Sequence, residues 1–231
     1  MLDLQQTVAA LVLEHSECAP ILQRHRIDFC CRGEASLRDA CARVGLDAEA
    51  VARELWSAIQ QRADRPEADP RRLSTEELIG FIVSKHHDYL RKTLPFVAAL
   101  ADKVSRVHGA HNPLLKELRA VVHELEDTLI PHLDDEERDL FPLLTSGQVD
   151  GARARSELTS MHAEHVTVGE LLRQLRAAAE DFATPEWACN SYRTLFSELE
   201  ALEGDVLRHV HLENHVLLPR FAAPAEGSQA S

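Results

Sequence analysis

One short pattern occurs twice in the sequence and pairs a histidine with a glutamate. HLDDEERDLFP (132–142) and HVHLENHVLLP (209–219) both read H-x3-E-x3-L-[FL]-P, and their first residues lie 77 positions apart. On an α-helix, side chains four residues apart differ by about 40° in direction, so each histidine and its glutamate can reach one centre. Imidazole and carboxylate groups are both ligands of transition-metal ions. The spacing therefore predicts metal binding.

A further histidine precedes each copy of the motif at nearly the same distance. His87 lies 45 residues before His132, and His165 lies 44 residues before His209. All of these donors interrupt apolar helical stripes, where burying an unpaired carboxylate would cost several kcal/mol. The sequence thus offers the same donor set twice. The candidate metal ligands are His87, His132, Glu136, His165, His209 and Glu213.

Four long periodic segments carry these donors. They cover 74–109, 113–144, 151–181 and the residues from 184 onward, with apolar side chains at spacings of three and four. Ser74 with Glu77 forms a capping-box pattern, and Thr184 followed by Pro185 is typical of a helix start. Short connections make neighbours antiparallel, so we expect an all-α fold, an up-down-up-down four-helix bundle with a small N-terminal helical domain. At about 1.5 Å per residue, the six donors then share one layer.

The chain divides into four expected parts. Residues 1–63 form short helices around a DFCCRG loop, and the charged stretch RADRPEADPRR with its two prolines indicates a linker, which we place at 64–72. The bundle then spans 73–221. The tail, 222–231, is expected to be disordered.

Composition excludes several classes of partner and location. The chain has 25 Lys and Arg against 38 Asp and Glu, a formal net charge of −13, so neither nucleic acid nor an anionic membrane is expected to bind it. No apolar run approaches the roughly 20 residues that span a bilayer. The N-terminus lacks the basic segment of a secretory signal. Five cysteines, two of them adjacent, do not form a secreted disulfide pattern, so we expect a cytoplasmic protein.

The number and type of donors narrow the choice of metal. Six donors without a cysteine exceed what a four-coordinate structural zinc site needs. Two ions fit better, each with two imidazoles and with both carboxylates bridging. Helical bundles hold di-iron and di-manganese centres in this way, and mixed nitrogen and oxygen ligation favours iron. A single histidine on an apolar face is more often a core residue than a ligand, but a repeated layer of six argues for metal.

The remaining histidines of the bundle are expected to lie outside the ligand set. His108 lies 21 residues after His87, roughly 31 Å along an α-helix, which is too far for a shared centre. His162 lies about 60° from His165 round the helix, where it could contact a ligand from outside. His123 is expected to face solvent. Four histidines lie off the stripes: His86, His123, His211 and His215.

At these residues the sequence resembles a known family. DFCCRGEASL, KHHDYLRKTLP, RVHGAH, HLDDEERDLFP, MHAEHVTVGELL and HVHLENHVLLPR are similar to segments of the iron–sulfur cluster repair di-iron proteins, whose bundle is hemerythrin-like. The resemblance covers nearly the whole chain and implies two iron ions joined by an oxo bridge. It implies that the four candidate histidines are terminal ligands and that Glu136 and Glu213 bridge the ions. The family loop is usually CC followed by two glycines, whereas Arg32 replaces the first glycine here.

The resemblance also implies a function. Members of the family are associated with recovery from nitrosative and oxidative stress, so the expected role is repair of damaged iron–sulfur clusters by supplying iron, with damaged iron–sulfur proteins as partners. The alternative is a protein that binds, scavenges or reduces nitric oxide. A weaker alternative is an oxygen-binding or sensing module, which has no evident use for the N-terminal thiols. The family favours a homodimer, and the sequence does not decide whether the protein is an enzyme.

The adjacent cysteines Cys30 and Cys31 are the candidate for further chemistry. Adjacent thiols form a strained disulfide ring, so a stable structural bridge is not expected. A reactive, exposed pair could instead accept or pass iron or electrons. The other three cysteines fall on apolar helical faces and are expected in the core: Cys18, Cys41 and Cys189.

Overall fold

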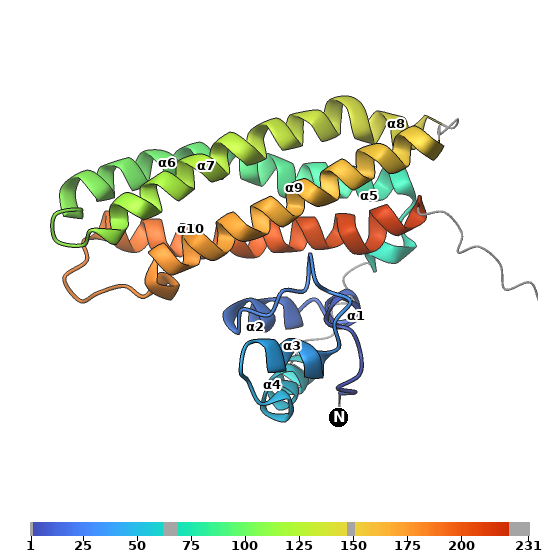
Figure 1. Ribbon diagram of the computed structural model, residues 1–231, viewed down its shortest axis with the longest axis horizontal. Coiled ribbons are helices and arrows are strands. Elements are labelled where there is room, and N and C mark those ends of the chain that lie inside the picture. The colour runs from blue at the N-terminus through green and yellow to red at the C-terminus, as the bar shows by residue number, and fades with distance from the viewer. Residues whose placement is uncertain (1, 62–68, 147–150, 222–231) are drawn as a thin grey trace, which may run out of the picture.

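The structure is a computed structural model, shown in Figure 1. It describes residues 2–61, 69–146 and 151–221, so most of the predicted linker and the tail predicted to be disordered, 222–231, lie outside the described residues. Within these ranges the predicted all-α class is confirmed: no strand forms, and an isolated β-bridge joins Thr7 to Ser36. None of the described helices combines the length and the apolar character that crossing a membrane requires.

Residues 2–61 form a small helical unit with its own apolar core, which includes Leu11, Leu22, Leu37 and Leu55. Its helices are α1 (Val8–Glu14), α2 (Cys18–Arg24), α3 (Leu37–Arg43) and α4 (Ala48–Gln61). The loop between α2 and α3 carries the adjacent cysteines and points toward the larger unit (Figure 1).

The larger unit is a bundle of four antiparallel arms (Figure 1). The first arm follows the short turn η1 (Pro70–Arg72) and consists of α5 (Thr75–Ile82), η2 (Val83–His87) and α6 (Asp88–His108). The second consists of α7 (Leu114–Asp135), η3 (Glu136–Leu140) and α8 (Phe141–Thr145). The third is α9 (Gly151–Ala178), followed by η4 (Glu180–Phe182). The fourth consists of α10 (Asn190–Leu212), η5 (Glu213–Leu217) and η6 (Leu218–Arg220).

The bundle begins with the predicted cap. The hydroxyl of Ser74 accepts from the backbone N–H of Glu77, whose carboxylate accepts from the N–H of Ser74, so both parts of the capping box are present. Leucines and valines of all four arms then fill the interior with a continuous apolar core. This packing makes the arms rigid supports for the polar layer inside them.

The predicted start of the fourth helix at Thr184 and Pro185 is wrong. Helix α10 begins at Asn190, and the residues before it form a turn in which Ala188 N–H donates to the Pro185 carbonyl (3.0 Å). The guanidinium of Arg193 donates to the carbonyls of Ala188 and Glu186, so it satisfies groups that an extra helical turn would have paired. The helix is shorter because a side chain replaces its first backbone hydrogen bonds.

Three of the arms contain a π-helical turn within the described residues. The turn η2 ends at His87, whereas η3 begins at Glu136 and η5 begins at Glu213. π-turns are rare and occur frequently at functional sites. Each of these turns therefore marks a place where the backbone departs from regular α-geometry next to a predicted donor.

Candidate metal centre

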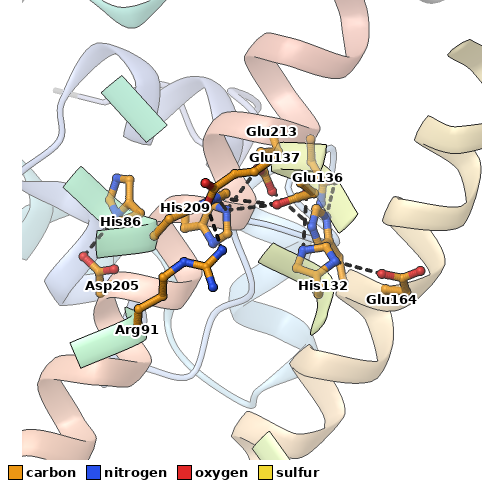
Figure 2. Close-up of polar contacts among 12 residues, drawn as sticks. His86, Arg91, His132, Glu136, Glu137, Glu164, Asp205, His209 and Glu213 are labelled. Carbon is orange, nitrogen blue, oxygen red and sulfur yellow. Dashed lines mark hydrogen bonds and ion pairs between the residues drawn. The ribbon is translucent and has the colours of Figure 1, made fainter. Parts of the chain in front are cut away.

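The six predicted donors come from four arms and meet inside the bundle, each 4% exposed or less. Figure 2 shows His132, Glu136, His209 and Glu213 directed toward one another. Regular α-turns present His132, His165 and His209. The π-turn η2 ends at His87, and the π-turns η3 and η5 begin at the two glutamates. The donors form two groups that share both carboxylates.

The first group contains His87 and His209. Their Nε2 atoms lie 3.2 Å apart. His209 Nε2 lies 2.9 Å from Glu213 Oε1, and His87 Nε2 lies 3.4 Å from Glu136 Oε2. The donor atoms of this group all lie within 4.8 Å of one another. Two nitrogen and two oxygen donors thus converge on one point.

The second group contains His132 and His165. His132 Nε2 lies 3.3 Å from Glu136 Oε1, and His165 Nε2 lies 3.1 Å from Glu213 Oε2. Each glutamate therefore directs one oxygen toward the first group and the other oxygen toward the second. This is the arrangement in which a carboxylate can bridge two cations.

The outer nitrogens of three imidazoles are held by side chains around the centre. These bonds join His87 Nδ1 to Glu137 (2.9 Å), His132 Nδ1 to Glu164 (2.8 Å) and His165 Nδ1 to Asn214 (3.0 Å). Because each partner atom is an acceptor, Nδ1 carries the proton and Nε2 keeps its lone pair toward the centre. The fourth imidazole, His209, has no such partner among the described residues, and its ring stacks on His86 at 5.8 Å and 14°.

The electrostatics of the centre follow from burial. Burial, with the nearby carboxylate of Glu213, raises the pKa of Glu136 well above its usual range. Burial also opposes ionisation of Glu213, but the imidazoles of His209 and His165 outweigh it and hold the pKa of Glu213 well below its usual range. Burial lowers the pKa of His209 to about 4. Burial also lowers the pKa of His132, whereas at His165 burial is outweighed by the carboxylate of Glu213, which raises the pKa of that imidazole. Two crowded, buried carboxylates beside imidazoles are a combination that favours a cation.

Several buried donor atoms of the centre have no hydrogen-bond partner among the described residues. They are His132 Nε2, His165 Nε2, both carboxylate oxygens of Glu136 and Glu213 Oε2. An unpaired buried polar atom costs about 1–3 kcal/mol, so a cluster of them calls for a ligand. The residues fit a pair of metal ions, since each donor group supplies two nitrogens and two oxygens.

Three other histidines of the bundle lie outside the donor groups, as predicted, and one of them adjoins the centre. The imidazole of His162 donates to Asn214 Oδ1 (3.2 Å), so it shares with His165 an acceptor next to the centre. His108 lies at the far end of α6, with Nε2 3.2 Å from the sulfur of Cys189. His123 is partly exposed and bonds Asp102 (3.0 Å).

Two histidines that lie off the stripes are buried all the same. His86 pairs with Asp205 of α10 at 3.1 Å (Figure 2), and His211 donates to the carbonyl of Phe29 at 3.0 Å. His211 is buried because the N-terminal unit, which the stripe pattern does not include, covers a further face of α10. His86 is buried between two arms, against α10 itself. Of the three cysteines expected in the core, Cys18 and Cys41 are buried, but Cys189 precedes α10 and is exposed, so that expectation is wrong.

Three acceptors around the centre were missed by the sequence reasoning. Each is the chain neighbour of a predicted donor, because consecutive residues on a helix point about 100° apart and one of them faces the adjacent arm. This adjacency to a donor was the available signal. The acceptors are Glu137 beside Glu136, Glu164 beside His165 and Asn214 beside Glu213.

The adjacent thiols of Cys30 and Cys31 lie on the side of the centre that faces the N-terminal unit. Cys30 is buried and Cys31 is half-buried, and their sulfurs are 3.6 Å apart as free thiols. The hydrogen bond from Cys30 lowers the pKa of Cys31, whereas that bond and burial raise the pKa of Cys30 well above its usual range. Arg32 does not take a positive φ, so the arginine is accommodated. A side chain at Gly33 would meet the Phe29 carbonyl at 2.5 Å, so glycine is required there.

Hydrogen bonds connect the thiol loop to the second donor group. The side-chain amide of Asn214 donates to the carbonyl of Cys30 (3.1 Å), while its oxygen accepts from His165. The sulfur of Cys31 lies 3.5 Å from the carbonyl of His165. A cavity of about 490 Å³ opens beside both thiols and is lined also by His162 and Asn214. The thiols therefore lie next to one half of the centre.

Comparison with known proteins agrees with this architecture. Residues 79–221 match the family described as the hemerythrin HHE cation binding domain. Residues 4–59 match ScdA_N, a domain described as being of unknown function (DUF542). Proteins named iron-sulfur cluster repair protein YtfE are similar over most of the chain. Those of Yersinia pseudotuberculosis serotype IB (strain PB1/+) and Yersinia pestis (strain Pestoides F) are each 34% identical over 215 residues, 93% of this chain and 96% of the relative.

Proposed function

Because the chain belongs to the family of hemerythrin-like iron–sulfur cluster repair proteins, we propose that it repairs iron–sulfur clusters damaged by nitrosative or oxidative stress, by supplying iron. The printed names of its relatives support the repair role. The paired donor groups support a store of iron inside the bundle. The five cysteines are free thiols, which supports a reducing compartment and hence the cytoplasm.

We assign the six donors as iron ligands. His87 and His209 would hold one ion, and His132 and His165 the other. The carboxylates of Glu136 and Glu213 would be shared, since each directs one oxygen toward each group. Four protein donors would leave further coordination positions open on each iron ion, so each ion could exchange the ligands at those positions.

The residues around the centre prepare it for metal. The acceptors at His87, His132 and His165 hold the proton on Nδ1 and so keep Nε2 available. Burial keeps water away from the carboxylates, and the leucine-rich arms hold the donors in one layer. The chain thus contributes binding, orientation and exclusion of water.

The observation that carries the proposal is the position of the thiol pair. Cys31 touches the backbone of His165, and both thiols border the cavity beside the second donor group. A protein that only binds a gas at its metal centre has no need of thiols at this place. Thiolate ligands between the store and the surface suit a protein that hands iron to an iron–sulfur protein.

The test separates iron storage from iron delivery. We expect the double variant Cys30→Ser/Cys31→Ser to keep normal iron content but to lose most restoration of a damaged iron–sulfur enzyme, measured by recovery of cluster absorbance. Cys189→Ser is the control, because this exposed cysteine lies at the far end of the bundle. Full restoration by the double variant would contradict the proposal, as would consumption of nitric oxide by the wild type without any restoration.

A further inference from the structure

The loop between α2 and α3 brings three ligand side chains together outside the bundle centre. The ligand atoms of Asp28, Cys30 and Cys31 all lie within 4.8 Å of one another. None of the three belongs to the two donor groups inside the bundle. We propose that they form a separate binding site for one divalent transition-metal ion that accepts thiolate ligands, with Fe2+ as the ion in function.

The spacing of the donors fits a single ion. The sulfurs of Cys30 and Cys31 are 3.6 Å apart. Two thiolates at about 2.3 Å from one tetrahedral ion lie roughly 3.7 Å from each other, whereas a disulfide bond is only about 2.05 Å long. The carboxylate of Asp28 lies beside this pair, because the thiol of Cys30 donates to its Oδ1 at 3.3 Å, a bond that is given up when the thiol loses its proton.

The loop is held in this shape before any ion binds. Asp28 Oδ1 accepts from the backbone N–H groups of Cys30 (3.1 Å), Cys31 (2.9 Å) and Arg32 (3.3 Å). The carbonyl of Cys30 accepts from Asn214 (3.1 Å) and His215 (2.8 Å) on the fourth arm. A carboxylate has about four lone-pair positions on its two oxygens, so with Oδ1 used by the backbone, the capacity of Asp28 for a metal lies on Oδ2. The ligands are thus preorganised by the backbone and by the bundle.

The remaining coordination position faces open space. Both thiols line the cavity of about 490 Å³, together with Glu34, His162 and His215. Sites with three protein ligands and an open fourth position exchange ligands, whereas closed four-ligand sites are structural. Binding replaces two S–H bonds by two metal–sulfur bonds and releases both protons to solvent, without change of oxidation state. A thiolate of a partner could complete the coordination.

The position of the site gives it a role that rests on the proposed function. Cys31 lies 3.5 Å from the carbonyl of His165, so the site adjoins the donor group of His132 and His165 and not that of His87 and His209. An ion leaving that half of the centre would exchange imidazole and carboxylate ligands for thiolates before it reaches the cavity. Iron delivered to a partner is thus expected to come from the second donor group.

Cobalt binding tests the site without any assay of repair. Full-length protein with its bundle loaded with iron and its thiols reduced is titrated anaerobically with Co2+. We expect one additional Co2+ per chain, with thiolate-to-cobalt charge-transfer absorption. Cys30→Ser and Cys31→Ser should abolish this absorption, Asp28→Asn should weaken binding roughly tenfold or more, and the control Cys189→Ser should change nothing.

Two results would overturn the site. One is the absence of charge-transfer absorption at stoichiometric Co2+, and the other is its persistence in Cys31→Ser, a substitution at a half-buried position that is expected to fold. Iron content, measured separately, distinguishes this outcome from failure of the proposed function. A cobalt site in a protein that restores no clusters would contradict the delivery of iron and leave the thiolate site standing.

Discussion

At the scale of single residues, the two buried glutamates carry the largest predicted effect. Each glutamate directs one oxygen toward the first donor group and the other oxygen toward the second. We therefore expect Glu136→Leu or Glu213→Leu to disrupt both metal positions and to lower the iron content by at least one ion of two. Iron per chain, measured by elemental analysis, checks this. The matched control is His123→Ala, a partly exposed histidine on the same arm as Glu136. Equal iron retention in all three variants would contradict the ligand assignment.

The acceptors behind the imidazoles are predicted to tune affinity. Glu164 holds Nδ1 of His132 at 2.8 Å, so Glu164→Ala should lower iron affinity about 10–100-fold, measured by competition with a chelator. Glu170→Ala provides the control, because Glu170 lies on the same helix and bonds only Arg173 and Gln174 in the described part of the chain. The same affinity for both variants would show that the bond to Glu164 does not orient the imidazole.

At the scale of elements, α10 serves both units, since one face carries His209 and another meets the N-terminal loop through His211. The π-turn η5 follows α10 on this arm, and an extra residue in a helical turn rotates the side chains that follow it. A metal centre with donors from four arms thus coexists with a docking surface on the fourth.

The junction at His211 predicts a pH dependence of stability. Burial lowers the pKa of His211 to about 4, while the unfolded chain keeps a value near 6.5. Between these values the unfolded state binds a proton that the folded state excludes, so the free energy of unfolding falls as the pH falls from 6.5 to 4. The full loss from this residue is on the order of 3 kcal/mol.

Denaturant unfolding of the metal-free protein checks this slope. His211→Gln keeps a donor for the Phe29 carbonyl but cannot titrate, so its stability should change less between pH 7 and pH 4.5 than that of the wild type. The comparison removes the contribution of the other histidines, which both proteins share. Parallel pH profiles would show that His211 is not excluded from protonation.

At the scale of the whole molecule, the units have different tasks, and a truncation separates them. A fragment beginning at Leu73 contains all six donors and the four arms, so it is expected to fold and to bind two irons with the absorption of an oxo-bridged ferric pair. Removal of iron should lower its melting temperature, since bound metal at one hundred times its Kd adds roughly 2.7 kcal/mol to stability.

The same fragment lacks the thiol loop, so it should lose most restoration of damaged clusters while its iron content stays normal. Full-length Cys30→Ser/Cys31→Ser is the reference, because it removes the thiols and keeps the N-terminal unit. A fragment that folds but binds no iron would show that the donors of the bundle need the N-terminal unit in place.

The sequence by itself determined the helical class, the antiparallel arms and the six side chains that converge, because spacings of three, four and seven residues report directly on the faces of a helix. It could not show that His87 pairs with His209 and His132 with His165, since pairing depends on how the arms rotate against one another and on π-turns that leave no periodic trace. The helix α10 starts later than the cap pattern at Thr184 predicts because the side chain of Arg193 donates to backbone carbonyls ahead of the helix, a contact that helical periodicity does not report. The position of Cys31 against His165 was likewise decided only in three dimensions, by contacts between residues 134 positions apart that no local pattern encodes.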